Sequence, residues 1–163
     1  MKIFGVAGWK NGGKTGLVER LVKEIVSQGY SVSTIKHAHH ETNVDHEGTD
    51  SFRHRGAGAS QVILSSPDRW ALMSELAGRE EVSLDHLLEK LDPVDLVLIE
   101  GYKSSAYPKI EAHRLETGKT LLALENETVV AVACNWAPDI PQPVFDLDDT
   151  TGVAKFILAQ VDL

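Results

Sequence analysis

The stretch from Gly8 to Thr15 has the residue types and the spacing that bind nucleotide phosphates. It matches the pattern G-x-x-x-x-G-K-T. Glycines let successive backbone N–H groups turn toward phosphate oxygens, and the N-terminus of the following helix adds partial positive charge. Lys14 is expected to reach the terminal phosphates, and the Thr15 hydroxyl is expected to ligate Mg²⁺. The predicted nucleotide-binding residues are Gly8, Trp9, Lys10, Asn11, Gly12, Gly13, Lys14, Thr15 and Gly16.

A phosphate loop also needs an acidic partner for Mg²⁺, and two carboxylates flank one strongly apolar strand. Asp95 precedes this strand and Glu100 follows it. Five residues of strand separate them by roughly 16 Å. Ligands of a parallel sheet bind at the carboxyl ends of its strands, which favours Glu100. Glu100 is therefore predicted to hold Mg²⁺ directly or through a water, or to position water.

The polar segment 37–50 follows the second predicted strand and is expected to sense the terminal phosphate. Asp45 and Asp50 are its candidates to meet Mg²⁺ or the attacking water. The same segment is rich in histidine, which leaves open a transition-metal site that includes His39, His40 and His46. The predicted catalytic residues are Lys14, Glu100 and Asp50.

Two clusters of charged residues each allow two interpretations. Arg53 and Arg55 lie two positions apart on a predicted helix, so they diverge, and one is a candidate for a phosphate or an anionic substrate. Residues 109–114 mix both signs of charge and would either bind a partner or substrate or line the solvated face of a strand. The segment 135–139 lacks the lysine and the spacing of a guanine-reading N-K-x-D loop, so guanine and adenine both remain open.

The composition indicates one globular domain over residues 1–163 that binds anions with its first part. The net charge of −8 argues against nonspecific nucleic-acid binding. Residues 1–60 nevertheless hold 8 Lys/Arg against 6 Asp/Glu, whereas residues 61–163 hold 8 against 18. The single cysteine excludes an intramolecular disulfide. No apolar stretch approaches the ~20 residues of a membrane span and no signal peptide is recognised, so we expect a cytoplasmic protein.

Strand and helix patterns alternate along the chain, which predicts an α/β fold. The expected class is a P-loop NTPase-like, mainly parallel sheet flanked by helices, with some antiparallel strands. The expected strands are 2–7, 31–36, 61–65, 70–73, 94–99 and 129–134. The expected helices are 14–28, a short one from 50 or 51 to 56–58, one from 83 to 91, and one from 150. A proline-rich link is expected between 138 and 143.

Together these blocks resemble the MobB-type molybdopterin-guanine dinucleotide biosynthesis adapter family of small P-loop GTP-binding proteins. The resemblance rests on Gly8–Thr15, on residues 35–40 and 45–48, on 50–59, on 95–103 and on 109–114, in the family's order. The chain departs from the family pattern at Gly12-Gly13 with Gly16, where a serine and a second threonine are expected, and this departure is expected to loosen the loop.

The resemblance implies a homodimeric GTP-binding adapter that assists a MobA-type molybdopterin guanylyltransferase. The implied ligands are GTP and Mg²⁺, with molybdopterin as a possible bound substrate, and any GTP hydrolysis would be weak. No arginine is placed as an obvious finger, which also predicts slow turnover. The alternatives are a metallochaperone GTPase that uses the histidine-rich segment, a small-molecule kinase, and a binding module whose nucleotide is structural.

Overall fold

The computed structural model describes residues 1–38 and 43–163 and divides the chain into two compact units. The first unit contains residues 1–37 and 91–163, and the second contains residues 38–90. The single nucleotide-binding domain expected over 1–163 stays a prediction.

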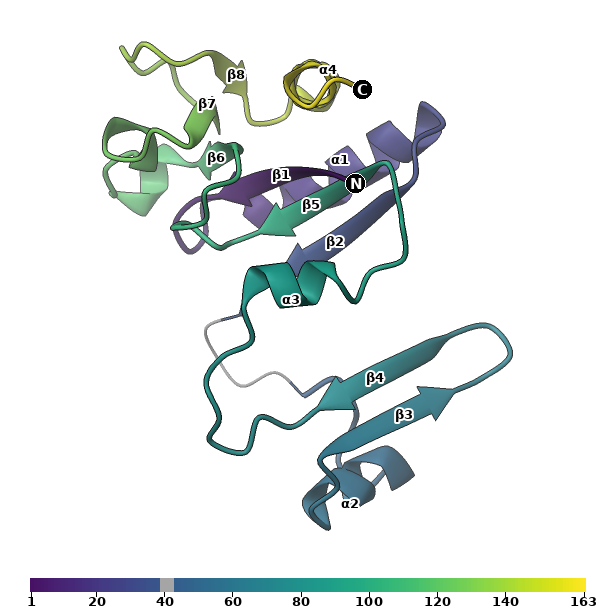
Figure 1. The fold of residues 1–163 in the computed structure, drawn as a ribbon. Helices are drawn as coiled ribbons and strands as arrows, with labels where there is room; N and C mark the ends of the chain where they lie inside the picture. Colours follow the sequence, from purple (N-terminus) through teal and green to yellow (C-terminus); the bar gives the residue numbers. More distant parts are fainter. Residues whose placement is uncertain (39–42) are drawn as a thin grey trace. The chain divides into compact units, whose positions relative to one another are not determined.

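A six-stranded sheet forms the centre of the first unit (Figure 1). Its order is β2-β5-β1-β6-β7-β8, and every neighbouring pair is parallel. The strands are β1 Lys2–Ala7, β2 Val32–Lys36, β5 Leu96–Glu100, β6 Lys109–His113, β7 Val129–Cys134 and β8 Val144–Asp146. Strands of a parallel sheet are covered on both faces, which explains the continuous apolar runs of β1, β5 and β7.

Two helices, α1 (Lys14–Ser27) and α4 (Thr150–Gln160), pack together and close the larger core of this unit. The buried positions of α1 follow the helical period, at Leu17, Val18, Leu21 and Ile25. A smaller apolar cluster surrounds β7 and the 3₁₀ turn η2 (Leu122–Leu124). A second 3₁₀ turn, η1 (Leu115–Thr117), follows β6.

Strand β6 corrects the interpretation of residues 109–113 as part of a partner-binding cluster or a solvated strand face, whereas Arg114 follows the strand and is exposed. It lies between β1 and β7, and its residues Lys109, Glu111 and His113 are at most 1% exposed. Glu111 Oε1 lies 2.9 Å from His113 Nδ1, and Glu111 Oε2 accepts from the backbone N–H of Ala123 at 3.0 Å. Lys109 Nζ donates to the carbonyl of Ser105 at 2.6 Å. Hydrogen bonds make the burial of these polar groups possible.

The second unit contains a two-stranded antiparallel sheet and two short helices. Its elements are α2 Asp50–Gly56, β3 Gln61–Ser65, β4 Trp70–Ser74 and α3 Leu84–Leu88. The turn between the strands is closed by a hydrogen bond from Ser66 N–H to the carbonyl of Arg69 at 2.9 Å. Ser83 caps α3, because its hydroxyl accepts from the His86 N–H at 3.3 Å.

The predicted fold class is confirmed: a parallel sheet carries helices, and a small antiparallel sheet accompanies it. The predicted strand starts and ends differ from the structure by two residues at most. The third helix was predicted to reach 91 but ends at Leu88, and β8 follows the proline-rich link without having been predicted. In the described part of the chain, no helix has the length and apolar character needed to span a bilayer.

Candidate nucleotide site

The loop Gly8–Thr15 connects β1 to α1 at the carboxyl end of the sheet's central strand. Its backbone lies directly against β6: a Cβ at Gly8 would lie 2.2 Å from the carbonyl oxygen of Ala112, and one at Gly12 would lie 2.6 Å from the same atom. Only glycine permits such an approach at these two positions. Gly12, which departs from the family pattern and was expected to loosen the loop, instead allows the loop to contact β6 at this point.

A depression of about 350 Å³ lies over the loop and the first turn of α1. Its lining residues are Asn11, Gly13, Lys14, Thr15 and Gly16. All five belong to the predicted nucleotide-binding set, which the structure thus brings together around one concave surface. Lys10 lies exposed at the loop tip.

The Lys14 side chain is held against the loop by a backbone carbonyl of the loop. Its Nζ donates to the carbonyl of Trp9 at 2.7 Å. Burial lowers the pKa of Lys14, the charge of Glu100 opposes this shift, and the cations Lys103 and Lys36 add to the lowering. The ammonium is thus close to several charges of both signs, as expected for a group that binds phosphates.

Glu100 lies where strand geometry placed it. The Thr15 hydroxyl donates to Glu100 Oε1 at 2.9 Å, which joins the first turn of α1 to the end of β5. Only 8% of Glu100 is exposed. Asp95 lies before β5 and accepts from Ser31 N–H and Oγ at 2.7 and 2.6 Å. The Ser31 hydroxyl and N–H lower the pKa of Asp95, which has a structural role at the far end of the strand.

Lys36 is a third member of this cluster, and the sequence reasoning missed it. It ends β2, where its register partner across the parallel ladder is Glu100. Its Nζ donates to Glu100 Oε1 at 2.9 Å and to the Thr15 hydroxyl at 3.2 Å. Strand order would have revealed this contact, since β2 and β5 are neighbours and both end at the loop.

The Thr15 and Glu100 oxygens fit a magnesium ion. Mg²⁺ prefers oxygen ligands in octahedral geometry at about 2.0–2.1 Å, so two adjacent ligands lie about 2.9 Å apart. The observed separation of Thr15 Oγ1 and Glu100 Oε1 is 2.9 Å. Direct ligation by both side chains is therefore compatible with the backbone as it stands.

Further cations surround the loop. The Trp9 ring is anchored by a hydrogen bond from Nε1 to the carbonyl of Thr120 at 2.8 Å, and Lys103 Nζ lies 3.9 Å from the ring centroid. Arg114 reaches the loop from the end of β6, with its Nε 3.4 Å from where a Cβ of Gly13 would lie. Arg114 thus lies beside the loop through its place at the end of β6, and the prediction that no arginine acts as a finger stays a prediction.

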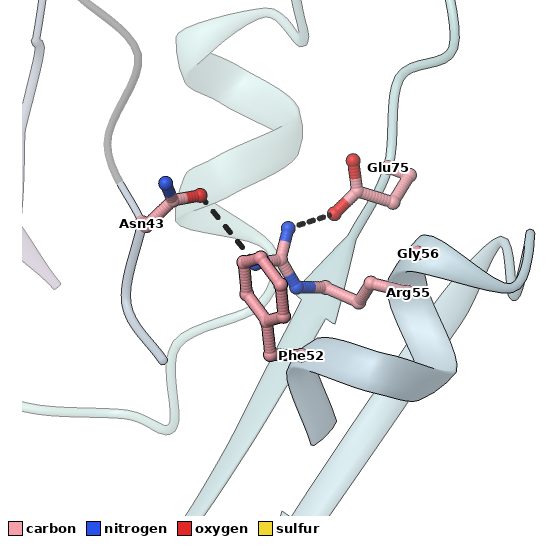
Figure 2. Close-up of a pocket in the computed structure, with 5 residues that line it drawn as sticks. All are labelled: Asn43, Phe52, Arg55, Gly56 and Glu75. Atoms are coloured by element: carbon pink, nitrogen blue, oxygen red, sulfur yellow. Dashed lines mark hydrogen bonds and ion pairs between the residues drawn. The ribbon is translucent and has the colours of Figure 1, made fainter. Parts of the chain in front are cut away.

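The second unit holds the remaining predicted site residues. Asp50 begins α2 and is exposed, and its catalytic role stays a prediction. Arg55, one of the two candidate phosphate-binding arginines, instead forms ion pairs with Asp45 and with Glu75 Oε1, the latter at 2.7 Å. Figure 2 shows its guanidinium between Asn43, Phe52 and Glu75. These pairs hold Arg55 and Asp45 within this unit, whereas Arg53 is exposed.

A transition-metal site in the histidine-rich segment stays untested. His39 and His40 lie outside the described residues, and His37 stacks on Tyr102 with ring centroids 4.5 Å apart. Within residues 1–38 and 43–163, no three His, Cys, Asp or Glu side chains are grouped for metal binding.

Known proteins share both the sequence and the fold of this chain. Residues 3–135 match the family model described as molybdopterin guanine dinucleotide synthesis protein B. The molybdopterin-guanine dinucleotide biosynthesis adapter protein of Haemophilus influenzae is 43% identical over 95% of this chain and 86% of its own length. The Escherichia coli adapter protein is 35% identical over 96% and 91%, respectively. A crystal structure of Bacillus subtilis MobB has a TM-score of 0.76 at 26% identity, covering 99% of this chain and 98% of that one.

Proposed function

This chain belongs to the molybdopterin guanine dinucleotide synthesis protein B family, and from that premise we propose that it binds GTP with Mg²⁺ through the Gly8–Thr15 loop. It is an adapter protein of molybdopterin-guanine dinucleotide biosynthesis. The proposed role is to assist the guanylyltransferase of that pathway, with at most weak GTP hydrolysis.

The observation that carries the nucleotide proposal is the contact between Thr15 and Glu100. Two residues 85 positions apart meet at 2.9 Å beside the loop, with the separation expected of adjacent magnesium ligands. A glycine-rich turn that only connects β1 to α1 would not require a nearly buried carboxylate at this point.

Each side chain has a defined task in the proposal. Backbone N–H groups of the loop and the Lys14 ammonium bind the phosphates. Thr15 and Glu100 hold Mg²⁺, which when bound neutralises charge on the phosphate oxygens. Asp50 is proposed to orient the attacking water. Lys103 and Arg114 extend the cationic surface beside the loop, which supports binding of an anionic ligand such as molybdopterin.

Nucleotide titrations test the proposal. We expect wild-type protein to bind GTP in Mg²⁺, and Lys14→Ala to weaken binding by roughly 10- to 100-fold because a charged hydrogen-bond donor is lost. Lys23→Ala removes the same charge from an exposed position of α1 and serves as the control. Absence of GTP binding, or equal affinity in Lys14→Ala, would refute the proposal. Titrations with ATP and with added guanylyltransferase then examine base choice and partner coupling.

A homodimer is the proposed assembly, and the hairpin β3–β4 supports it. An isolated two-stranded sheet is marginally stable, and this one exposes Ile63, Trp70 and Leu72, which share one face, by 44–67%. A second copy could cover an apolar surface with few charges by presenting the same surface, as two-fold interfaces do. Light scattering of wild type and Ile63→Lys tests this: the wild type should have twice the monomer mass, and the variant should be smaller.

A further inference from the structure

We propose that the Lys36 ammonium and the nucleotide-bound Mg²⁺ share one position between Thr15 and Glu100, so that Lys36 leaves this position when Mg²⁺ binds. Lys36 is then a positioning residue: it keeps the two oxygen ligands together and lowers the affinity of the site for the metal. This inference rests on the proposed function, because it concerns the same site.

The contacts of Lys36 are those of a cation in a metal site. Its Nζ lies 2.9 Å from Glu100 Oε1 and 3.2 Å from Thr15 Oγ1, the two oxygens proposed as magnesium ligands. Those oxygens are themselves 2.9 Å apart, so the three atoms form a nearly equilateral triangle. A magnesium ion that bound both oxygens at about 2.0–2.1 Å from the side that Nζ occupies would be in contact with the ammonium, and two cations repel at that distance.

Burial determines which partner moves. The Glu100 side chain is 10% exposed at the end of a buried strand, whereas the Lys36 side chain is 55% exposed. A half-exposed lysine stem can rotate its ammonium into water at little cost, but the carboxylate cannot follow. Lys14 does not take the place of Mg²⁺ between Thr15 and Glu100 in the described contacts, because its Nζ donates to the Trp9 carbonyl.

The strand ladder keeps Lys36 at this position. β2 pairs with β5 in parallel register from Val32↔Leu96 to Lys36↔Glu100. Successive side chains alternate between the faces of a sheet, so register partners point to the same face. The Lys36–Glu100 pair therefore follows from the fold and does not depend on a chance surface rotamer.

The decisive experiment measures the apparent dissociation constant for Mg²⁺ at saturating GDP, using a fluorescent GDP whose signal depends on Mg²⁺. Lys36→Met keeps the length of the side chain and removes its charge, and we expect Mg²⁺ to bind roughly fivefold more tightly or better. Lys23→Met is the matched control for loss of one exposed charge, and Lys36→Arg keeps a cation at the site. Both should remain within about twofold of wild type. Unchanged or weaker Mg²⁺ binding in Lys36→Met would overturn the inference.

A second arm without nucleotide separates this inference from the proposed function. Urea unfolding is compared in EDTA and in Mg²⁺ for wild type, Lys36→Met and Lys36→Met/Glu100→Gln. Mg²⁺ should raise the urea midpoint of Lys36→Met more than that of wild type, and the double variant should lose this gain. If no nucleotide binds but this pattern holds, the proposed function fails, whereas competition of Lys36 with Mg²⁺ for the Thr15 and Glu100 oxygens is still supported. Equal Mg²⁺ shifts in all three proteins would refute the inference alone.

Discussion

The carbonyl oxygen of Ala112 lies against Gly12, at 2.6 Å from where a Cβ of that residue would be. The end of β6 therefore supports the Gly8–Thr15 loop through backbone atoms that cannot move away independently of the sheet. The loop and β6 are more than 90 residues apart in the chain, and their contact constrains which side chains the loop accepts.

Gly12→Ala should weaken nucleotide binding for this reason. The added methyl group would force the loop away from β6 and disturb the N–H groups that are proposed to bind phosphate, and we expect at least a tenfold loss of GTP affinity, or about 1.4 kcal/mol. A nucleotide titration measures it. Gly56→Ala is the control, because Gly56 ends α2 with no neighbour within 4 Å of an added Cβ. Equal affinities would show that the loop can shift without loss.

Gly16→Ala is expected to raise the free energy of unfolding. Gly16 lies in the first turn of α1, and its added Cβ would meet only Arg20 Nη1 at 3.5 Å, an ordinary contact with a flexible side chain. Alanine has a higher helix propensity than glycine by about 0.8–1.0 kcal/mol. Urea unfolding should show a free energy of unfolding raised by up to that amount. A decrease would mean that Gly16 has a conformational role the described backbone does not require.

The buried pair Glu111–His113 should be sensitive to substitution. Glu111→Leu leaves His113 Nδ1 and the Ala123 N–H without their acceptor in a fully buried place, and we expect a loss of roughly 2–5 kcal/mol in the free energy of unfolding. Glu116→Leu removes an exposed carboxylate that accepts from Asn135, and should cost no more than about 1 kcal/mol. Similar losses in both variants, measured by urea unfolding, would contradict the buried network.

The Asp45–Arg55 pair predicts a specific acid sensitivity of the second unit. The hydrogen bond from Arg55 holds the pKa of Asp45 below its ordinary value of 3.8. A lowered folded-state pKa stabilises the fold above that ordinary value, and the contribution disappears as the pH falls through the folded-state pKa.

Hydrogen exchange of α2 measures this effect. Above about pH 5 the amides of wild type should be better protected than those of Asp45→Asn, and the difference should vanish as the pH falls below the ordinary carboxyl range. Glu47→Gln removes an exposed carboxylate nearby in sequence and should leave the pH dependence unchanged. A wild-type advantage that persists in strong acid would exclude Asp45 as its source.

The sequence predicted four of the six parallel strands, two of which are long apolar runs typical of buried strands, at residues 96–99 and 129–134. It also predicted that Glu100, and not Asp95, would lie beside Thr15, because the rise per residue and the direction of β5 determine which end is near the loop. The helix ending at Leu88 and the short β8 were less predictable, since segment ends depend on tertiary contacts.

Strand β6 is the instructive failure. Lys109, Glu111 and His113 alternate with apolar residues, a pattern that normally indicates a strand with one face in water. Here the polar face is buried too, and hydrogen bonds to specific partners make this burial possible. Such partners cannot be identified from the spacing of residues. Lys36 was missed for a related reason: its role depends on β2 and β5 being neighbours, and strand order is not encoded locally.

The strand order also affects how this chain can fold during its synthesis. β1 pairs with β5 and β6, and β2 pairs with β5. Neither of the two early strands can therefore form its hydrogen bonds until residues beyond position 95 have been synthesised. A ribosome adds about 5–20 residues per second, which leaves β1 without its partners for roughly 5–20 seconds. During that interval an apolar strand has two open edges, the condition that favours aggregation or chaperone binding. The Gly8–Thr15 loop is among the first segments synthesised, yet Thr15 meets its partner Glu100 only after β5 has been made.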